Sequence, residues 1–170
     1  MWPSSASGSR PSASRGLLVL GLGNDIMCDD AVGLEVVRCL QSMLQNVPGV
    51  TLRDTCEMGL SLLDFISGYD SLIVVDAVQT HQAPPGTVHE VNVEDLGQYP
   101  SLAPHGLGLG EILALGREIG LPMPTRVKVL AVEVADPFTV SAQMSEPLRQ
   151  ALPAVVARVA DLARAWCSPS

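Results

Sequence analysis

The amino-acid sequence predicts an α/β fold: a three-layer sandwich in which helices cover both faces of a mostly parallel, twisted sheet of about five strands. Three observations lead to this prediction. Short apolar runs end in glycine or aspartate, as in strands that are buried on both faces. Stretches with apolar residues at helical spacing alternate with these runs. One further stretch alternates apolar and polar residues, which is typical of an antiparallel edge strand.

The first half of the chain predicts the order strand, helix, strand, helix, strand. Buried strands are expected at 17–21, 50–54 and 71–76. Helices are expected between them, at 31–47 and 60–67. Pro48 and Gly49 end the first of these helices. Such an order makes right-handed crossovers between parallel strands, and ligands of such sheets bind beyond the carboxyl ends of the strands.

The second half completes the sheet. The segment 79–86, which contains two prolines in sequence and a glycine, predicts a turn before an edge strand at 87–93. A loop over 96–104 then leads to a helix at 105–119 and a strand at 126–132. The last helix is expected to begin near Ser145, with Pro147 in its first turn and a bend at Pro153.

The length and the cysteine content limit the number of domains and indicate the cellular compartment. A chain of 170 residues has room for one domain, which we expect over residues 16–166, between a disordered leader at 1–15 and a tail at 167–170. The four cysteines form no CxxC pair, so we expect neither a zinc knuckle nor a disulfide framework, but a reducing cytoplasm.

The charge excludes two classes of partner. The chain carries 18 acidic and 10 basic residues, a net charge of -8 that has the wrong sign for binding nucleic acid or an anionic membrane. Every apolar stretch is interrupted before the roughly 20 residues that a membrane-spanning helix needs. We therefore expect a soluble protein without nucleic-acid or membrane partners.

A glycine-rich turn at 21–33 follows the first strand but matches no phosphate-binding motif. Ile26 stands where a dinucleotide fingerprint needs its third glycine, and the only lysine, Lys128, is far from any P-loop position. The turn instead delivers two adjacent carboxylates, Asp29 and Asp30, to the start of a helix. One of them could cap that helix, and this alternative stays open.

Two further residues extend this set. Asp76 ends the most apolar strand, and His105 precedes a Gly-Leu-Gly-Leu-Gly stretch. Asp30, Asp76 and His105 together form an O,O,N set suited to a divalent metal such as zinc or nickel, and the neighbouring glycines would let a peptide approach. Alternatively, Asp76 binds loop amides and His105 is a surface or capping residue.

Other polar residues carry less weight. Cys56 and Glu57 follow the second strand and could face the same crevice. His81 and His89 lie in or beside the turn and the edge strand, where exposed histidines without a role are common. No serine or cysteine has a setting that supports a nucleophile.

Four motifs resemble those of the hydrogenase maturation endopeptidases. They are Leu20-Gly21-Leu22-Gly23-Asn24 with Asp29-Asp30-Ala31-Val32-Gly33, Ile73-Val74-Val75-Asp76-Ala77, Pro85-Gly86-Thr87-Val88 and Pro104-His105-Gly106-Leu107-Gly108-Leu109. Their order and spacing agree with that family over about residues 17–165. The chain departs from the family at Thr55-Cys56-Glu57-Met58-Gly59, where a Gly-Thr pair is usual.

The resemblance implies a hydrolase that removes the carboxyl-terminal extension of a nickel-iron hydrogenase large-subunit precursor, cutting after a His or Arg near its last cysteine motif. The family's metal and catalytic positions fall on Asp30, Asp76 and His105, with Asp29 and Glu57 as additional candidates. The implied metal is nickel, carried by the substrate and bound weakly by the protease. Two alternatives remain open: a non-catalytic nickel-site chaperone or checkpoint protein for the same precursor, and a general metallo-aminopeptidase. The nucleophile is also undecided.

Overall fold

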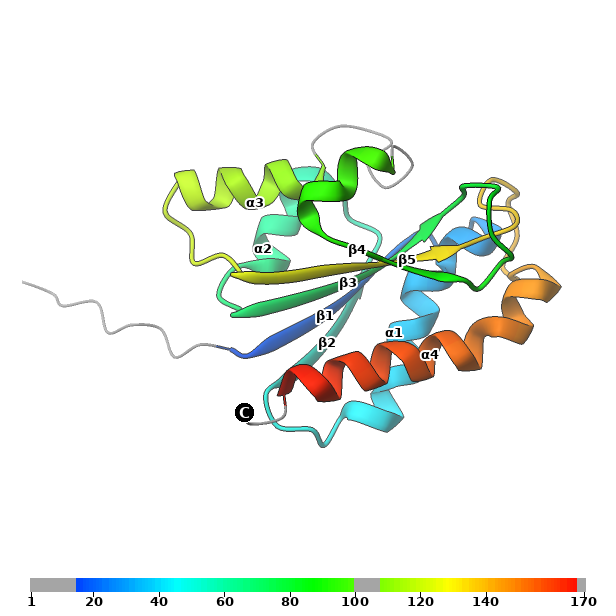
Figure 1. Cartoon of the computed structure of the whole chain (residues 1–170), viewed down its shortest axis with the longest axis horizontal. Coiled ribbons are helices and arrows are strands. Elements are labelled where there is room, and N and C mark those ends of the chain that lie inside the picture. Colours follow the sequence, from blue (N-terminus) through cyan, green and yellow to red (C-terminus); the bar gives the residue numbers. More distant parts are fainter. Residues whose placement is uncertain (1–14, 100–107, 168–170) are drawn as a thin grey trace, which may run out of the picture.

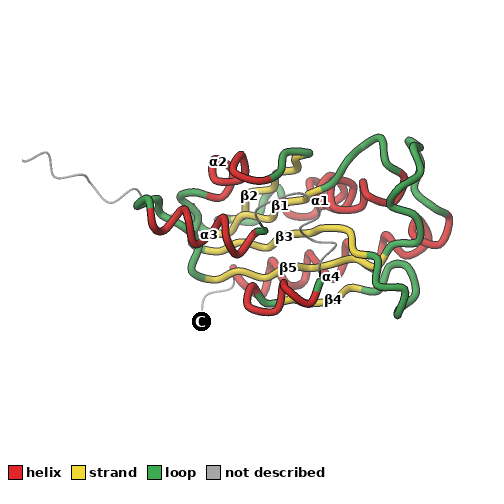
Figure 2. The backbone as a smooth tube through the Cα atoms, turned by 90° about the horizontal axis from the view of Figure 1, so that it is seen from above, coloured by secondary structure: helices red, strands yellow, loops and turns green. Residues whose placement is uncertain are grey.

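The computed structural model describes residues 15–99 and 108–167. Within these ranges the chain forms a five-stranded sheet in the order β2-β1-β3-β5-β4. The strands are β1 (Leu17–Leu22), β2 (Val50–Thr55), β3 (Ser71–Val78), β4 (Val88–Val91) and β5 (Arg126–Glu133). Strand β4, at the edge of the sheet, pairs antiparallel with β5, and the other strand pairs are parallel. Figure 2 shows the strands side by side in this order. The predicted fold class is confirmed.

Helices cover both faces of this sheet. The long helices are α1 (Val32–Leu44), α3 (Leu109–Glu118) and α4 (Glu146–Cys167), and α2 (Leu62–Ile66) is a short one. Single 3-10 turns add η1 (Cys28–Ala31), η2 (Gly59–Ser61) and η3 (Val93–Gln98). Figure 1 places α1 and α4 on one face and α2 and α3 on the other. No helix of the described residues is long and apolar enough to cross a bilayer.

The core has two halves, one on each side of the sheet, because neighbouring residues of a strand point to opposite faces. Ile73 and Val75 pack with α1 and α4, whereas Leu72 and Val74 pack with α2 and α3. Asp76 continues the second series and lies between Val74 and Val78 on the α2–α3 face. The same alternation along β5 puts Ala131 and Glu133 on that face.

The structure corrects several predicted boundaries. Strand β3 continues past Asp76 to Val78, because its last residues pair with β5, so Asp76 lies inside the strand and not at its end. Helix α1 starts after a 3-10 turn and ends at Leu44, three residues before the predicted end. The edge strand has only four residues, since the chain turns into η3 where extended structure and a loop were expected. The first residues of the predicted helix at 105–119, like most of the leader, lie outside the described residues.

Candidate functional site

Close packing of glycine backbones positions the turn after β1. A Cβ atom on Gly33 would lie 2.2 Å from the Leu22 carbonyl oxygen and 2.4 Å from that of Val75. A Cβ on Gly23 would lie 2.2 Å from the Asp30 carbonyl oxygen. The start of α1 therefore rests directly on β1 and β3, which brings η1 to the carboxyl end of the sheet. These glycines allow contacts within the chain, so the predicted role in substrate approach is not needed to explain them.

Asp29 is the buried member of the carboxylate pair. Its oxygens accept hydrogen bonds from the backbone N–H groups of Ala135 (2.9 Å), Asp136 (2.9 Å) and Ser145 (2.6 Å) and from the Ser145 hydroxyl (2.8 Å). These bonds tie η1 to the loop after β5 and to the residue before α4. Neither Asp29 nor Asp30 caps η1 or α1 through its side chain, so the capping alternative is wrong.

Asp30 and Asp76 come together above the carboxyl end of the sheet. Asp30 is half-buried, and no described residue donates a hydrogen bond to its carboxylate. Asp76 accepts one hydrogen bond, from the Ala77 N–H at 2.8 Å. Burial raises the pKa of the Asp76 carboxyl to about 7, the Ala77 bond opposes this rise, and the negative charge of Asp30 adds to it. Burial also raises the pKa of Asp30.

This pair has two chemical capabilities. A carboxyl with a pKa near neutrality can donate or accept a proton in the physiological range. Two carboxylates with few donors also leave oxygen lone pairs for a divalent cation. Within 15–99 and 108–167, no three His, Cys, Asp or Glu side chains form a metal-binding group. The third predicted ligand, His105, lies outside these residues.

The loop after β2 is exposed. Both Cys56 and Glu57 face solvent, and the Glu57 N–H donates to the Thr55 hydroxyl at 3.0 Å. The Glu57 carboxylate has no hydrogen-bonding or ionic partner among the described residues. The charge that raises the pKa of Asp76 is that of Asp30.

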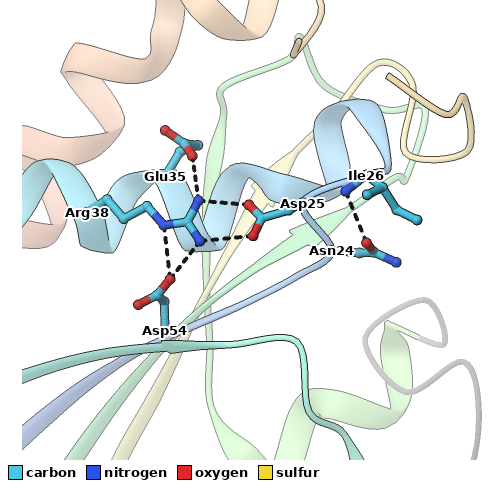
Figure 3. A network of polar contacts seen from close by, with 6 residues as sticks. All are labelled: Asn24, Asp25, Ile26, Glu35, Arg38 and Asp54. Atoms are coloured by element: carbon cyan, nitrogen blue, oxygen red, sulfur yellow. Dashed lines mark hydrogen bonds and ion pairs between the residues drawn. The ribbon is translucent and has the colours of Figure 1, made fainter. Parts of the chain in front are cut away.

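An ion-pair network braces the turn from outside (Figure 3). The Arg38 guanidinium of α1 binds both oxygens of Asp25, at 2.7 and 3.0 Å, and also Asp54 at the end of β2 and Glu35. The sequence did not predict this network, because its members lie on three separate elements. It links the turn after β1 to α1 and to β2, and so holds the backbone on either side of Asp29 and Asp30.

A buried carboxylate, Glu133, and its histidine partner were also not predicted from the sequence. Glu133 is 1% exposed and binds the Nε2 of His89 at 3.0 Å. One signal could have found it: like Asp76, Glu133 follows an apolar run in a parallel strand. His89, predicted to be an exposed residue without a role, is half-buried instead.

Comparison with known proteins identifies the family. A family model described as hydrogenase maturation protease matches residues 34–162, a range that includes Asp76 and His105 and begins just after Asp30. The chain is 30% identical over 148 residues to the hydrogenase 2 maturation protease of Escherichia coli, covering 82% of this chain and 90% of that protein. It is 27% identical over 159 residues to the hydrogenase expression/formation protein HupD of Rhizobium leguminosarum, covering 92% and 77%.

Solved structures agree. The hydrogenase 2 maturation peptidase of a Thaumarchaeota archaeon aligns with a TM-score of 0.59 and 30% identity, over 86% of this chain and 97% of that one. The hydrogenase maturating endopeptidase HybD of E. coli has the same fold, with a TM-score of 0.70 and 24% identity over 88% and 93% of the two chains. The chain thus belongs to the hydrogenase maturation protease family and is a hydrolase of that family.

Proposed function

We propose that this protein is the endopeptidase that removes the carboxyl-terminal extension of a nickel-loaded hydrogenase large-subunit precursor. The observation that carries the proposal is the pair of Asp30 and Asp76, two carboxylates at the carboxyl end of the sheet with a single hydrogen-bond donor between them. Membership of the maturation protease family supplies the substrate class.

In the proposed complex, three side-chain atoms of the protease bind the metal of the substrate. Asp30 and Asp76 each provide an oxygen and His105 a nitrogen to the nickel ion that the precursor already carries. Oxygen and imidazole ligands suit this borderline cation, and a set without thiolates binds it weakly enough to release the product. The free lone pairs of both aspartates support this assignment.

Peptide hydrolysis needs an activated water, a polarised carbonyl and a proton for the leaving amine. We propose that the water attacks beside the nickel-bound carboxylates. Asp30 or Asp76 then receives the proton that the water loses and returns it to the amine. We also propose that processing takes place in the cytoplasm, since the spacing of the four cysteines suits a reducing compartment.

The test is incubation of the purified protein with nickel-loaded precursor, followed by intact-mass measurement of the product. We expect a shortened large subunit, and no shortening of precursor prepared without nickel. Stable complex formation without cleavage would instead favour the chaperone or checkpoint function. Stoichiometric metal in the purified protein would favour a metallo-aminopeptidase.

A further inference from the structure

The carboxylate of Glu133 is fully occupied inside the protein. Its Oε1 accepts the backbone N–H groups of Thr80 (2.8 Å) and His81 (3.1 Å). Its Oε2 accepts the Thr80 hydroxyl (2.7 Å) and binds the Nε2 of His89 (3.0 Å). Burial alone would raise the pKa of Glu133, but these hydrogen bonds outweigh burial and lower it, so the group is ionised at neutral pH.

An ionised carboxylate can only accept hydrogen bonds, which determines the tautomer of His89. Its Nε2 must carry the proton that is donated to Glu133, and in the neutral ring the Nδ1 is then an acceptor. No described residue donates to this Nδ1. The Tyr99 ring lies beside the imidazole, with its centroid 6.1 Å from that of His89. His89 is therefore a fixed ring with an unused acceptor, and its side chain is 23% exposed.

The sheet register places this ring beside the proposed cleavage site. Ala131 of β5 pairs with Asp76 of β3 on one side and with His89 of β4 on the other. Paired residues on neighbouring strands point to the same face, so the three side chains form one row. Asp76 and His89 are two strand spacings apart, about 10 Å between Cα atoms, and the residue between them in the sheet, Ala131, has only a methyl side chain.

An extended peptide covers this distance with about three residues. We propose that His89, held by Glu133, binds the precursor chain beside Asp76 and accepts a hydrogen bond from one of its backbone amides through Nδ1. An amide N–H is the donor that nearly every residue of a peptide offers, whatever its side chain. The inference deepens the proposed function and rests on it. His89 is here a substrate-binding residue, and Glu133 is a positioning residue that acts through it.

The competing explanation is that the His89–Glu133 bond has a purely structural role. Two substitutions of His89 distinguish this explanation from a role in substrate binding. In His89→Gln the amide nitrogen reaches the place of Nε2 and keeps the bond to Glu133, but no acceptor remains at the place of Nδ1. His89→Leu removes both. Steady-state cleavage of nickel-loaded precursor and thermal unfolding are measured for each variant.

We expect both variants to raise KM between about three- and tenfold, the loss of one hydrogen bond, with kcat nearly unchanged, whereas only His89→Leu lowers Tm. A wild-type KM for His89→Gln overturns the inference. His81→Asn is the matched control: it removes the histidine of the turn between β3 and β4, and asparagine tolerates the positive φ of 58° at this position, so KM should stay unchanged.

Glu133→Gln tests the positioning role. We expect it to raise KM in the wild-type background but to add nothing to KM in the His89→Leu background, because its effect passes through His89. A further rise of KM in the double variant would overturn this role. A wild-type protein that leaves the precursor uncut would instead refute the proposed function. The dissociation constants of the precursor for wild type and His89→Gln then decide the inference: equal values overturn it.

Discussion

Buried and half-buried carboxylates of this protein fall into two groups with opposite surroundings. Asp29 and Glu133 each accept four hydrogen bonds from N–H or O–H groups and join segments that are distant in sequence. Asp30 and Asp76 lie close to one another and accept one bond between them. We call the first two the anchored carboxylates and the second two the open pair.

The difference shows that the fold uses some carboxylates to hold segments together and leaves others available for chemistry. Hydrogen bonds lower the pKa of the anchored Glu133, whereas burial and mutual repulsion raise the pKa of Asp76 to about 7. The anchored carboxylates have no capacity left for a ligand. The open pair has free oxygen lone pairs and a carboxyl group that can exchange a proton near neutral pH. Because few hydrogen-bond donors face these carboxylates, their burial destabilises the fold. Four predictions test this contrast.

The largest effect is expected for cleavage when one member of the proposed nickel-binding set is lost. Asp76→Asn and His105→Ala should each reduce precursor processing by on the order of a hundredfold or more, since each removes a ligand that acts directly at the reacting bond. Circular dichroism should remain that of the wild type. Asp64→Asn, on the exposed surface of α2, is the control and should cleave normally. Normal processing by both site variants would refute the assignment.

Asp29→Asn should instead destabilise the fold, by about 3 kcal/mol. The new amide N–H₂ would face the N–H donors of Ala135, Asp136 and Ser145, so buried donors lose their acceptor. Urea unfolding measures the effect. A loss below about 1 kcal/mol would mean that Asp29 is not anchored as the structure has it.

Removing a charge from the open pair should stabilise the protein, with a defined pH dependence. The pKa of Asp76 is raised on folding, so its favourable contribution is complete below its unfolded pKa and is lost as pH rises to about 7. Asp76→Asn should therefore gain about 2.5 kcal/mol in unfolding free energy, relative to wild type, between pH 5 and pH 8. Asp30→Asn should also gain unfolding free energy relative to wild type between pH 5 and pH 8, but less, because it removes only the part of the Asp76 pKa rise that the charge of Asp30 causes. A pH-independent difference would contradict the raised pKa.

The smallest effect is expected for Glu57→Gln, because this side chain is exposed and belongs to neither group. Stability should change by less than about 0.5 kcal/mol. The pH profile of cleavage and its response to salt should match those of the wild type. A shifted profile, or precursor binding weakened more at low salt than at high salt, would instead assign Glu57 to the crevice.

Much of this molecule could be predicted from local pattern. Apolar runs and helical spacing predicted the five strands, the covering helices and the antiparallel edge, because burial on one or both faces imposes a period on the sequence itself. The proximity of Asp30 and Asp76 also followed, since the turn after β1 and the last residues of β3 both lie at the carboxyl end of the sheet. The exact ends of β3 and β4 did not follow, because they depend on pairing with β5.

Only the tertiary structure separated Asp29 from Asp30 and revealed the role of Glu133. The two aspartates are equivalent as sequence neighbours, but the N–H and O–H donors that occupy Asp29 begin at Ala135, 106 residues further along the chain. Glu133 likewise meets Thr80, His81 and His89 across the sheet. Whether a carboxylate becomes an anchor or a reactive group depends on the donors that folding brings to it, and those partners leave no local signal in the sequence.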